Sequence, residues 1–321
     1  MRVGIIGLGS IATKAYLPVV TSLAGVTPVL VSRSPGKLSG VGDARRIPDR
    51  FASVQEAIGS GLDAAMVHTS SQTHPEIVAA LLRSGVPVLV DKPLATDYAT
   101  ARGLVSLADE LGVSLMVGFN RRYAPAYREF ADWPDRDVIS LHKHRSQQPG
   151  SARDMVFDDF IHVIDTLRFL VPSGMADLVI DTNVDEHGRC RRLSVQFTGQ
   201  GRLAVGVMSW TAGMSHEVLD VIGGGRRRQV TDLADIVDFA GQERVVRRDG
   251  WESASALRGF TAMCEDFLDA VAQGRRLDAT DALLTHEAIS SNPRFSMINS
   301  DRMGGSLSER HTTTPSTAAT R

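Results

Sequence analysis

The first twelve residues, Met1-Arg-Val-Gly-Ile-Ile-Gly-Leu-Gly-Ser-Ile-Ala12, decide the fold of this chain. Residues 3–6 have the apolar character of a buried strand, and they lead through a glycine-rich turn into a helical pattern. Gly7 allows a sharp turn, Gly9 lets a phosphate approach the backbone, and the free N–H groups at the start of the helix attract its charge. This strand–turn–helix predicts a dinucleotide-binding loop, whose cofactor contacts we assign to Gly7, Gly9, Ser10, Ile11 and Ala12.

Apolar runs and helical patterns alternate through the first third of the chain. We predict strands over residues 26–31, 64–68, 86–90 and 115–117, and helices over 75–84 and 98–111. Pro18 lies inside the first helical pattern and is expected to kink it. Strict alternation of strand and helix indicates βαβ units, so we predict an α/β Rossmann domain with a doubly wound parallel sheet over residues 1–119.

The pattern changes near Asn120, where a second domain is predicted over residues 120–290. Its expected strands cover residues 138–144, 178–184, 191–197, 203–210, 217–222 and 227–232, and its helices 156–170, 260–272 and 279–289. Consecutive strands with short connections indicate an α+β domain with an open, mostly antiparallel sheet faced by helices on one side. Residues 291–321 lose periodicity and are rich in Ser, Thr and Pro, which predicts an atypical disordered tail.

Composition excludes several classes of partner. The 321 residues are 43% hydrophobic and 22% charged, with a formal net charge of -2, so neither nucleic acid nor an anionic membrane is expected to bind. Cys190 and Cys264 are too few for a disulfide framework or a zinc site, which fits a reducing cytoplasm. We therefore predict a cytoplasmic protein without a membrane span.

The end of the second strand indicates which nicotinamide cofactor binds. An acidic residue there holds the ribose 2′-hydroxyl of NAD, whereas an arginine accommodates the 2′-phosphate of NADP. Here the strand ends at Ser32 and Arg33, with Lys37 just beyond and no acid. Arg33 can stack on adenine and bind phosphate, and Ser32 can donate a hydrogen bond. The alternative is an ordinary surface arginine, but the glycine loop upstream favours NADP(H) over NAD(H).

Two segments carry groups that could perform chemistry. Lys92 follows a buried strand at the edge where open α/β sheets bind ligands, although a lysine also commonly caps a strand end. Asp158 and His162 are four residues apart on a predicted helix, so a carboxylate and an imidazole share a face as an acid–base pair or as a plain salt bridge. Asp159 and Asp165 fall on other faces and are interpreted as structural or solvated. His142 and His144 alternate along a strand, but nothing supplies a third ligand, and no metal is expected.

Five motifs in register resemble the GFO/IDH/MocA family of nicotinamide-dependent oxidoreductases, and within it the MviM-like group. These motifs are the glycine loop, Thr69-Ser-Ser-Gln-Thr-His74, Asp91-Lys-Pro93, Val117-Gly-Phe-Asn-Arg-Arg-Tyr123 and Asp158-x-x-x-His162. The resemblance covers residues 1 to about 290 and implies a Rossmann domain followed by a substrate domain. Asp91 stands where the family usually has glutamate, a departure shared with the MviM-like group.

The resemblance also implies roles for individual residues. Lys92 would touch both the nicotinamide side and the substrate hydroxyl, with His162 as the acid–base residue and Asp158 beside it. The cofactor would also contact Thr69, Ser70, His74 and Asp91, and the substrate would contact Asn120 and Arg121 in addition to Lys92 and His162.

The resemblance further implies a sugar, a polyol or a derivative as substrate, and a homodimer or homotetramer through the open face of the second sheet. The expected activity is hydride transfer between nicotinamide and a carbinol or carbonyl carbon. Two alternatives remain open: a non-catalytic NADP-binding sensor or partner protein of the same fold, and an inactive relative whose altered tail after residue 290 weakens folding.

Overall fold

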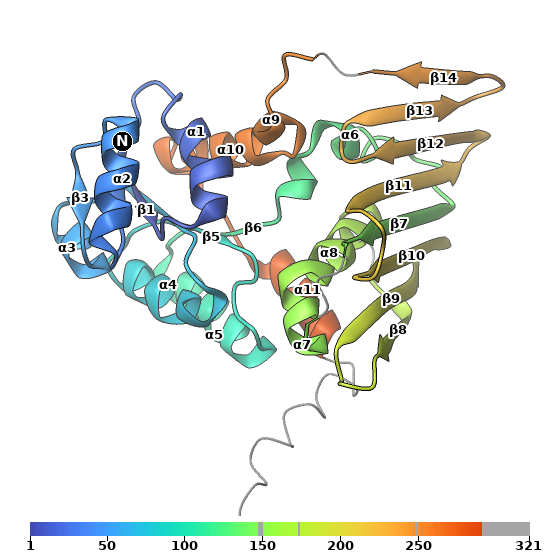
Figure 1. Cartoon of the computed structure of the whole chain (residues 1–321), viewed down its shortest axis with the longest axis horizontal. Helices are drawn as coiled ribbons and strands as arrows, with labels where there is room; N and C mark the ends of the chain where they lie inside the picture. The colour runs from blue at the N-terminus through green and yellow to red at the C-terminus, as the bar shows by residue number, and fades with distance from the viewer. Residues whose placement is uncertain (147–149, 173, 248–249, 291–321) are drawn as a thin grey trace, which may run out of the picture.

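The computed structural model describes residues 1–146, 150–172, 174–247 and 250–290. Two β-sheets stand apart with helices around and between them (Figure 1). The predicted tail over residues 291–321 lies outside the described residues.

The first sheet has six parallel strands in the order β3-β2-β1-β4-β5-β6. Strand order reverses at β1, and Ile6 pairs with Val31 on one side and with Val67 on the other, so three carboxyl ends meet at one level. Ligands bind at such switch points in open α/β sheets. The strands are β1 Arg2–Ile6, β2 Thr27–Val31, β3 Arg50–Phe51, β4 Ala64–Val67, β5 Val88–Asp91 and β6 Leu115–Gly118.

Helices cover both faces of this sheet, and its central strands are buried apolar runs, as strands buried on both faces require. The helical segments are π-helix η1 Ala12–Tyr16, α1 Leu17–Val20, α2 Pro35–Arg45, α3 Val54–Gly59, 3-10 turn η2 Ser71–Thr73, α4 His74–Arg83 and α5 Tyr98–Leu111. Pro18 lies in the first turn of α1, where its missing N–H leaves no helical bond unmade.

The second sheet has eight strands in the order β14-β13-β12-β11-β7-β10-β9-β8, and its pairs are antiparallel except for β7 with β10. Helix α8 packs against β7 and β10, while no helix within the described residues covers the opposite face (Figure 1). Its strands are β7 Val138–His144, β8 Ala176–Val184, β9 Cys190–Gly199, β10 Arg202–Ser209, β11 His216–Gly223, β12 Arg226–Thr231, β13 Asp235–Phe239 and β14 Glu243–Val246.

The remaining helical segments connect the two sheets. They are 3-10 turn η3 Asn120–Tyr123, α6 Pro125–Arg128, α7 Ala152–Met155, π-helix η4 Val156–Phe160, α8 Ile161–Leu170, α9 Ala254–Leu257, α10 Phe260–Ala272 and α11 Thr280–Ser290. Although α10 follows the second sheet in the chain, its apolar residues Met263 and Phe267 join the buried cluster of Val3 and Ile5 in β1. The chain thus returns to cover the first sheet.

The structure confirms the predicted fold class, a parallel sheet followed by a mostly antiparallel one. It differs in detail: β3, β13 and β14 were not predicted, and the predicted helix over residues 156–170 begins as the π-helix η4. Within the described residues, no helix is both long and apolar enough to cross a bilayer.

Candidate functional site

A cavity of about 670 Å³ lies at the carboxyl ends of β1, β2 and β4. The residues predicted to bind cofactor that line it are Gly7, Gly9, Ser10, Ile11, Ser32, Arg33, Lys37, Thr69 and Ser70. Residues not singled out from the sequence line it too, among them Val54, Gln55, His68, Glu76 and Ile77. Most of these lie at the starts of α3 and α4, where no glycine pattern marks them.

The glycine loop fits a phosphate for a steric reason. Gly7 has a φ of +92°, and a Cβ there would stand 2.8 Å from the Thr69 backbone nitrogen. A Cβ on Gly9 would meet no atom within 4 Å, so it would project into open space. Ala12 is fully buried in η1, where its small side chain lets this helix lie against β1. The backbone at Gly9 is therefore accessible to a pyrophosphate.

The cavity ends at a basic group beside β2. Arg33 and Lys37 are exposed at its rim, and the Ser34 side chain caps α2 by accepting from the Lys37 amide. Ser32 Oγ accepts from the Ser34 amide at 3.2 Å, which leaves its own proton free to be donated. This end of the cavity can hold a phosphate ester.

The loop after β4 is fixed by two buried histidines. His74 binds two main-chain carbonyls, with Nδ1 2.7 Å from the Pro93 oxygen and Nε2 3.1 Å from the Thr69 oxygen. His74 is therefore a clamp between the loop under the cavity and the segment after Lys92, rather than a lining residue. The His68 ring packs against Tyr16 in a tilted arrangement, with ring centroids 4.0 Å apart.

Lys92 and Asp91 lie at the end of β5, beside the cofactor cavity and not in its lining. The Asp91 carboxylate accepts from the Lys92 amide at 2.9 Å, and Lys92 Nζ donates to the main-chain carbonyl of Asp158. Burial lowers the pKa of Lys92, while Asp91, Asp159 and Asp158 oppose that shift. Lys92 thus links the first sheet to the π-helix of the second domain and keeps two protons for a ligand.

His162 lies in the first turn of α8 and is 9% exposed. Burial lowers its pKa well below the ordinary range, and the cations of Arg121, Lys92, Lys143 and Arg145 lower it further. The imidazole is therefore neutral near pH 7 and able to accept a proton.

The expected pairing of Asp158 with His162 is not formed. The Asp158 side chain is exposed, and in the described part of the chain it makes no hydrogen bond with His162. Asp158 and Asp159 lie in the π-helix η4, whose turn is wider than that of an α-helix. Within this turn the main-chain carbonyl of Asp158, and not its carboxylate, faces Lys92.

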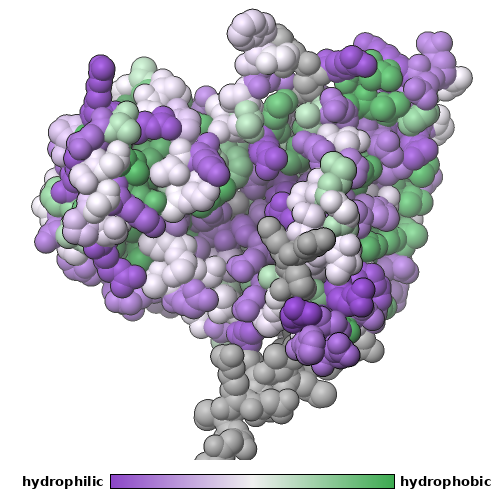
Figure 2. All heavy atoms as spheres, viewed as in Figure 1, coloured by the Kyte–Doolittle hydropathy of each residue, from purple (hydrophilic) through white to green (hydrophobic). Residues whose placement is uncertain are grey.

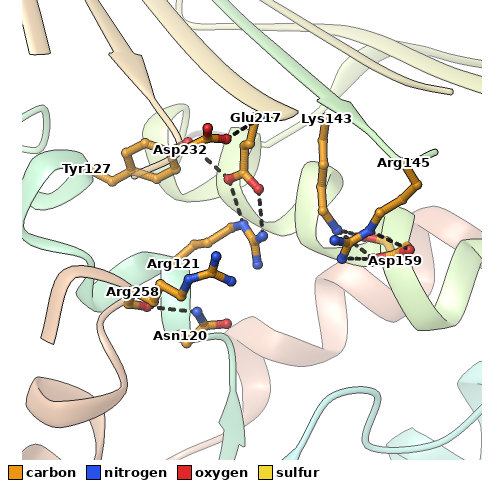
Figure 3. A network of polar contacts seen from close by, with 9 residues as sticks. All are labelled: Asn120, Arg121, Tyr127, Lys143, Arg145, Asp159, Glu217, Asp232 and Arg258. Carbon is orange, nitrogen blue, oxygen red and sulfur yellow. Dashed lines mark hydrogen bonds and ion pairs between the residues drawn. The ribbon is translucent and has the colours of Figure 1, made fainter. Parts of the chain in front are cut away.

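A polar network includes Asn120 and Arg121, two of the residues expected to touch substrate (Figure 3). Arg121 forms a buried bidentate ion pair with Glu217, at 2.8 and 2.6 Å, and Tyr127 donates to the same carboxylate at 3.0 Å. Asn120 donates to the Arg258 carbonyl at 2.7 Å, beside the start of α10. Both predicted substrate residues thus have structural partners.

Asp159, interpreted from the sequence as structural or solvated, is an ion-pair centre in the same network. Lys143 Nζ lies 2.7 Å and Arg145 Nη2 2.9 Å from its Oδ1 (Figure 3). The opposing cations hold the pKa of this carboxyl well below its usual range despite burial. Figure 2 shows hydrophilic side chains gathered in the hollow between the two lobes.

Comparison with known proteins matches each half of the chain to a family. Residues 1–119 match the oxidoreductase family with an NAD-binding Rossmann fold, GFO/IDH/MocA, and residues 125–238 match the YceM-like C-terminal domain. The protein YceM of Salmonella typhimurium is 35% identical over 84% of this chain and 89% of its own length. The myo-inositol dehydrogenase Hyg17 of Streptomyces leeuwenhoekii is 29% identical over 78% of this chain and 66% of its own length.

Comparison with solved structures supports the same family. A Gfo/Idh/MocA family oxidoreductase from Vibrio cholerae superposes with a TM-score of 0.86 and 28% identity, over 94% of this chain and 99% of that one. The dehydrogenase MviM from Clostridium difficile gives a TM-score of 0.85 and 27% identity over the same shares of the two chains. This chain therefore belongs to the GFO/IDH/MocA family of NAD(P)-binding oxidoreductases.

Proposed function

We propose that this protein is an NADP-dependent oxidoreductase that acts on a CH–OH group of a sugar, a polyol or a derivative. The observation that carries the proposal is the position of Lys92, which joins the edge of the cofactor cavity to the segment that holds His162. Relatives that carry the name inositol 2-dehydrogenase support this substrate class.

His162 and Lys92 have separate roles in the proposed reaction. In oxidation, neutral His162 accepts the hydroxyl proton, and the Lys92 ammonium stabilises the negative charge that develops on the substrate oxygen. In reduction the same groups supply the proton and polarise the carbonyl. The nicotinamide, when bound, supplies the hydride chemistry.

The preference for NADP is supported by the basic rim of the cavity. Arg33 and Lys37 are exposed there, and the second strand ends without the acid that would hold a ribose 2′-hydroxyl. Both cations are placed to bind a 2′-phosphate through charge-assisted hydrogen bonds.

An absorbance assay of nicotinamide reduction tests the proposal. The protein is offered sugars and polyols with NADP⁺ or NAD⁺, alongside Lys92→Met and Arg33→Ser. Lys92→Met is expected to lower kcat roughly 100-fold or more while NADPH binding persists, because it removes the cation that stabilises the developing charge. Arg33→Ser is expected to weaken NADP⁺ roughly 10- to 100-fold and to leave NAD⁺ unchanged.

The outcomes separate the competing functions. NADPH binding without turnover of any compound would favour the sensor. Equal use of both cofactors by the unmodified protein would reject the NADP preference and leave the reaction class intact.

A further inference from the structure

Two cations in the cleft share a single carboxylate. Lys143 Nζ and Arg145 Nη2 both contact Asp159 Oδ1, and Arg145 Nε reaches Oδ2 at 3.2 Å. Lys143 also donates to the Asp159 main-chain carbonyl at 3.2 Å. The Lys143–Asp159 pair is neutral by itself, so the guanidinium of Arg145 adds a positive charge that Asp159 does not balance.

The neighbouring carboxylate cannot supply the missing negative charge. Both carboxylate oxygens of Glu217 accept hydrogen bonds from Arg121, and Tyr127 donates to this carboxylate as well. The residues drawn in Figure 3 include four basic side chains, Arg121, Lys143, Arg145 and Arg258, and three acidic ones, Asp159, Glu217 and Asp232. Burial and the charges of Arg121 and Arg145 lower the pKa of Lys143 to about 7, so this lysine is fully charged only below neutral pH, whereas the arginines stay charged.

Of the two positive side chains that share Asp159, that of Arg145 is the more exposed to solvent. The Lys143 side chain is 3% exposed and the Asp159 side chain 17%, whereas the Arg145 side chain is 36% exposed. Within the described residues, the hydrogen bonds of the Arg145 side chain use Nε and Nη2, so Nη1 keeps both of its donors. A planar guanidinium with free donors is suited to a carboxylate or a phosphate.

Arg145 also lies near the reacting groups. Its partner Asp159 precedes His162 by one helical turn and follows Asp158, whose main-chain carbonyl binds Lys92. The charges of Arg145 and Lys143 also act on His162. One ligand can therefore contact Arg145 and extend towards His162 and Lys92.

We propose that Arg145 binds an anionic group of the substrate, a carboxylate or a phosphate, so that the substrate is an acidic derivative of a sugar or polyol. This inference rests on the proposed function and specifies its substrate class. Lys143 and Asp159 are positioning residues in this scheme, because Asp159 holds the Nε and Nη2 edge of Arg145 and leaves Nη1 to the ligand.

The experiment compares ligands that differ in one group. D-Glucose, D-glucuronate and D-glucose 6-phosphate share a ring and differ at C6, and myo-inositol and its monophosphate form a second set. Binding to the NADPH-loaded protein is measured by calorimetry and turnover by nicotinamide absorbance. The acidic members are expected to bind roughly 10- to 100-fold more tightly than the neutral member of their set.

Two variants should act in opposite directions. Arg145→Gln is expected to abolish the preference for acidic ligands over neutral ones. Asp159→Asn is expected to tighten acidic ligands, since it frees the Nε and Nη2 edge of Arg145. Arg227→Gln removes a half-exposed arginine paired with Asp220 and is the control that should change neither. A merely structural role for the network would weaken all ligands in both variants.

Neutral ligands that bind as tightly as acidic ones, or a panel in which no acidic member binds, would overturn the proposal. Preference in the unmodified protein is measured without any variant, so a variant that fails to fold does not prevent the test. Loss of the carboxylate but not of the phosphate preference in Arg145→Gln would restrict the anion to a carboxylate. Turnover of neutral sugars alone would reject the acidic substrate and still support the proposed reaction.

Discussion

His68 is buried, and within the described residues no hydrogen bond offsets the loss of solvation of its ring. It is 5% exposed, and neither ring nitrogen has a hydrogen-bond partner among the described residues. Burial lowers its pKa to about 3, with a smaller contribution from His74. The native state therefore holds His68 neutral, while an unfolded chain would protonate it near pH 6.5.

We predict that His68 makes the protein sensitive to acid. Below pH 6.5 the unfolded state binds a proton that the native state refuses, so the stability due to this residue is lost as pH falls from 6.5 towards 3, at about 1.4 kcal/mol per pH unit. His68→Phe keeps the ring against Tyr16 and should lose about 2 kcal/mol less than the unmodified protein between pH 7.5 and pH 5. Urea unfolding at both pH values measures this difference.

The exposed His187 supplies the control, and His187→Gln should follow the unmodified protein. An unchanged pH dependence in His68→Phe would contradict the prediction. His162 and His286 also have lowered pKa values because of burial, so part of the acid sensitivity should remain in the variant.

Single residues also show what a sequence pattern can predict and what it cannot. The spacing of Asp158 and His162 indicated the right segment, since the charge of Lys92 contributes to the lowered pKa of His162. The pattern could not show that Asp158 contributes its main-chain carbonyl, because the π-helix alters the turn between them. Likewise Arg121 looked like a substrate ligand, and its buried partner Glu217 lies 96 residues away in the chain.

At the level of elements, an ion-pair cluster holds α11 against α8 and η3. Arg122 binds both carboxylate oxygens of Asp165, and Thr285 donates to Asp165 at 3.0 Å. Arg168 donates to Asp281 Oδ1 at 2.9 Å. The Asp165 side chain is 1% exposed, whereas that of Asp281 is 58% exposed, so the two carboxylates differ in solvation.

We predict that these two carboxylates contribute unequally to stability. Asp165→Ala would leave Arg122 without its buried partner and should cost about 3–5 kcal/mol in the free energy of unfolding. Asp281→Ala removes a solvated partner and should cost about 1 kcal/mol or less. Chemical denaturation of the two variants at neutral pH measures the difference, and equal losses would contradict the prediction.

Elements were predictable from sequence where burial imposes a clear pattern. The helices α5 and α10 and the strand β7 match their predicted ranges because apolar periodicity and flanking glycines mark them. The strand β14, Glu243–Val246, has mostly exposed residues, and β3 has only two residues, so neither carries a pattern. The position of α10 on the first sheet depends on long-range packing that no local signal encodes.

At the scale of the whole molecule, no described element covers one face of the second sheet (Figure 1). Register places His142 between Val207 and Val218, and Ile222 beside Val138, on that face. Ile222 is 42% exposed and Val179 60%. Apolar side chains on an uncovered sheet face favour association with a second surface.

We propose that this face joins two copies of the chain into a homodimer, and we predict that a charge placed on it separates them. Ile222→Lys should convert the dimer to a monomer at micromolar concentration, measured by size-exclusion chromatography with light scattering, because a two-fold interface would bury one unpaired lysine from each copy. Leu284→Lys is the matched control, since Leu284 is also 42% exposed but lies on α11. A monomeric unmodified protein would overturn the proposed dimer. A dimer that survives Ile222→Lys and not Leu284→Lys would place the interface away from the sheet. Retention of NADPH binding in the Ile222→Lys monomer would show that the cofactor cavity, which is lined by residues 6–80, is complete within one copy.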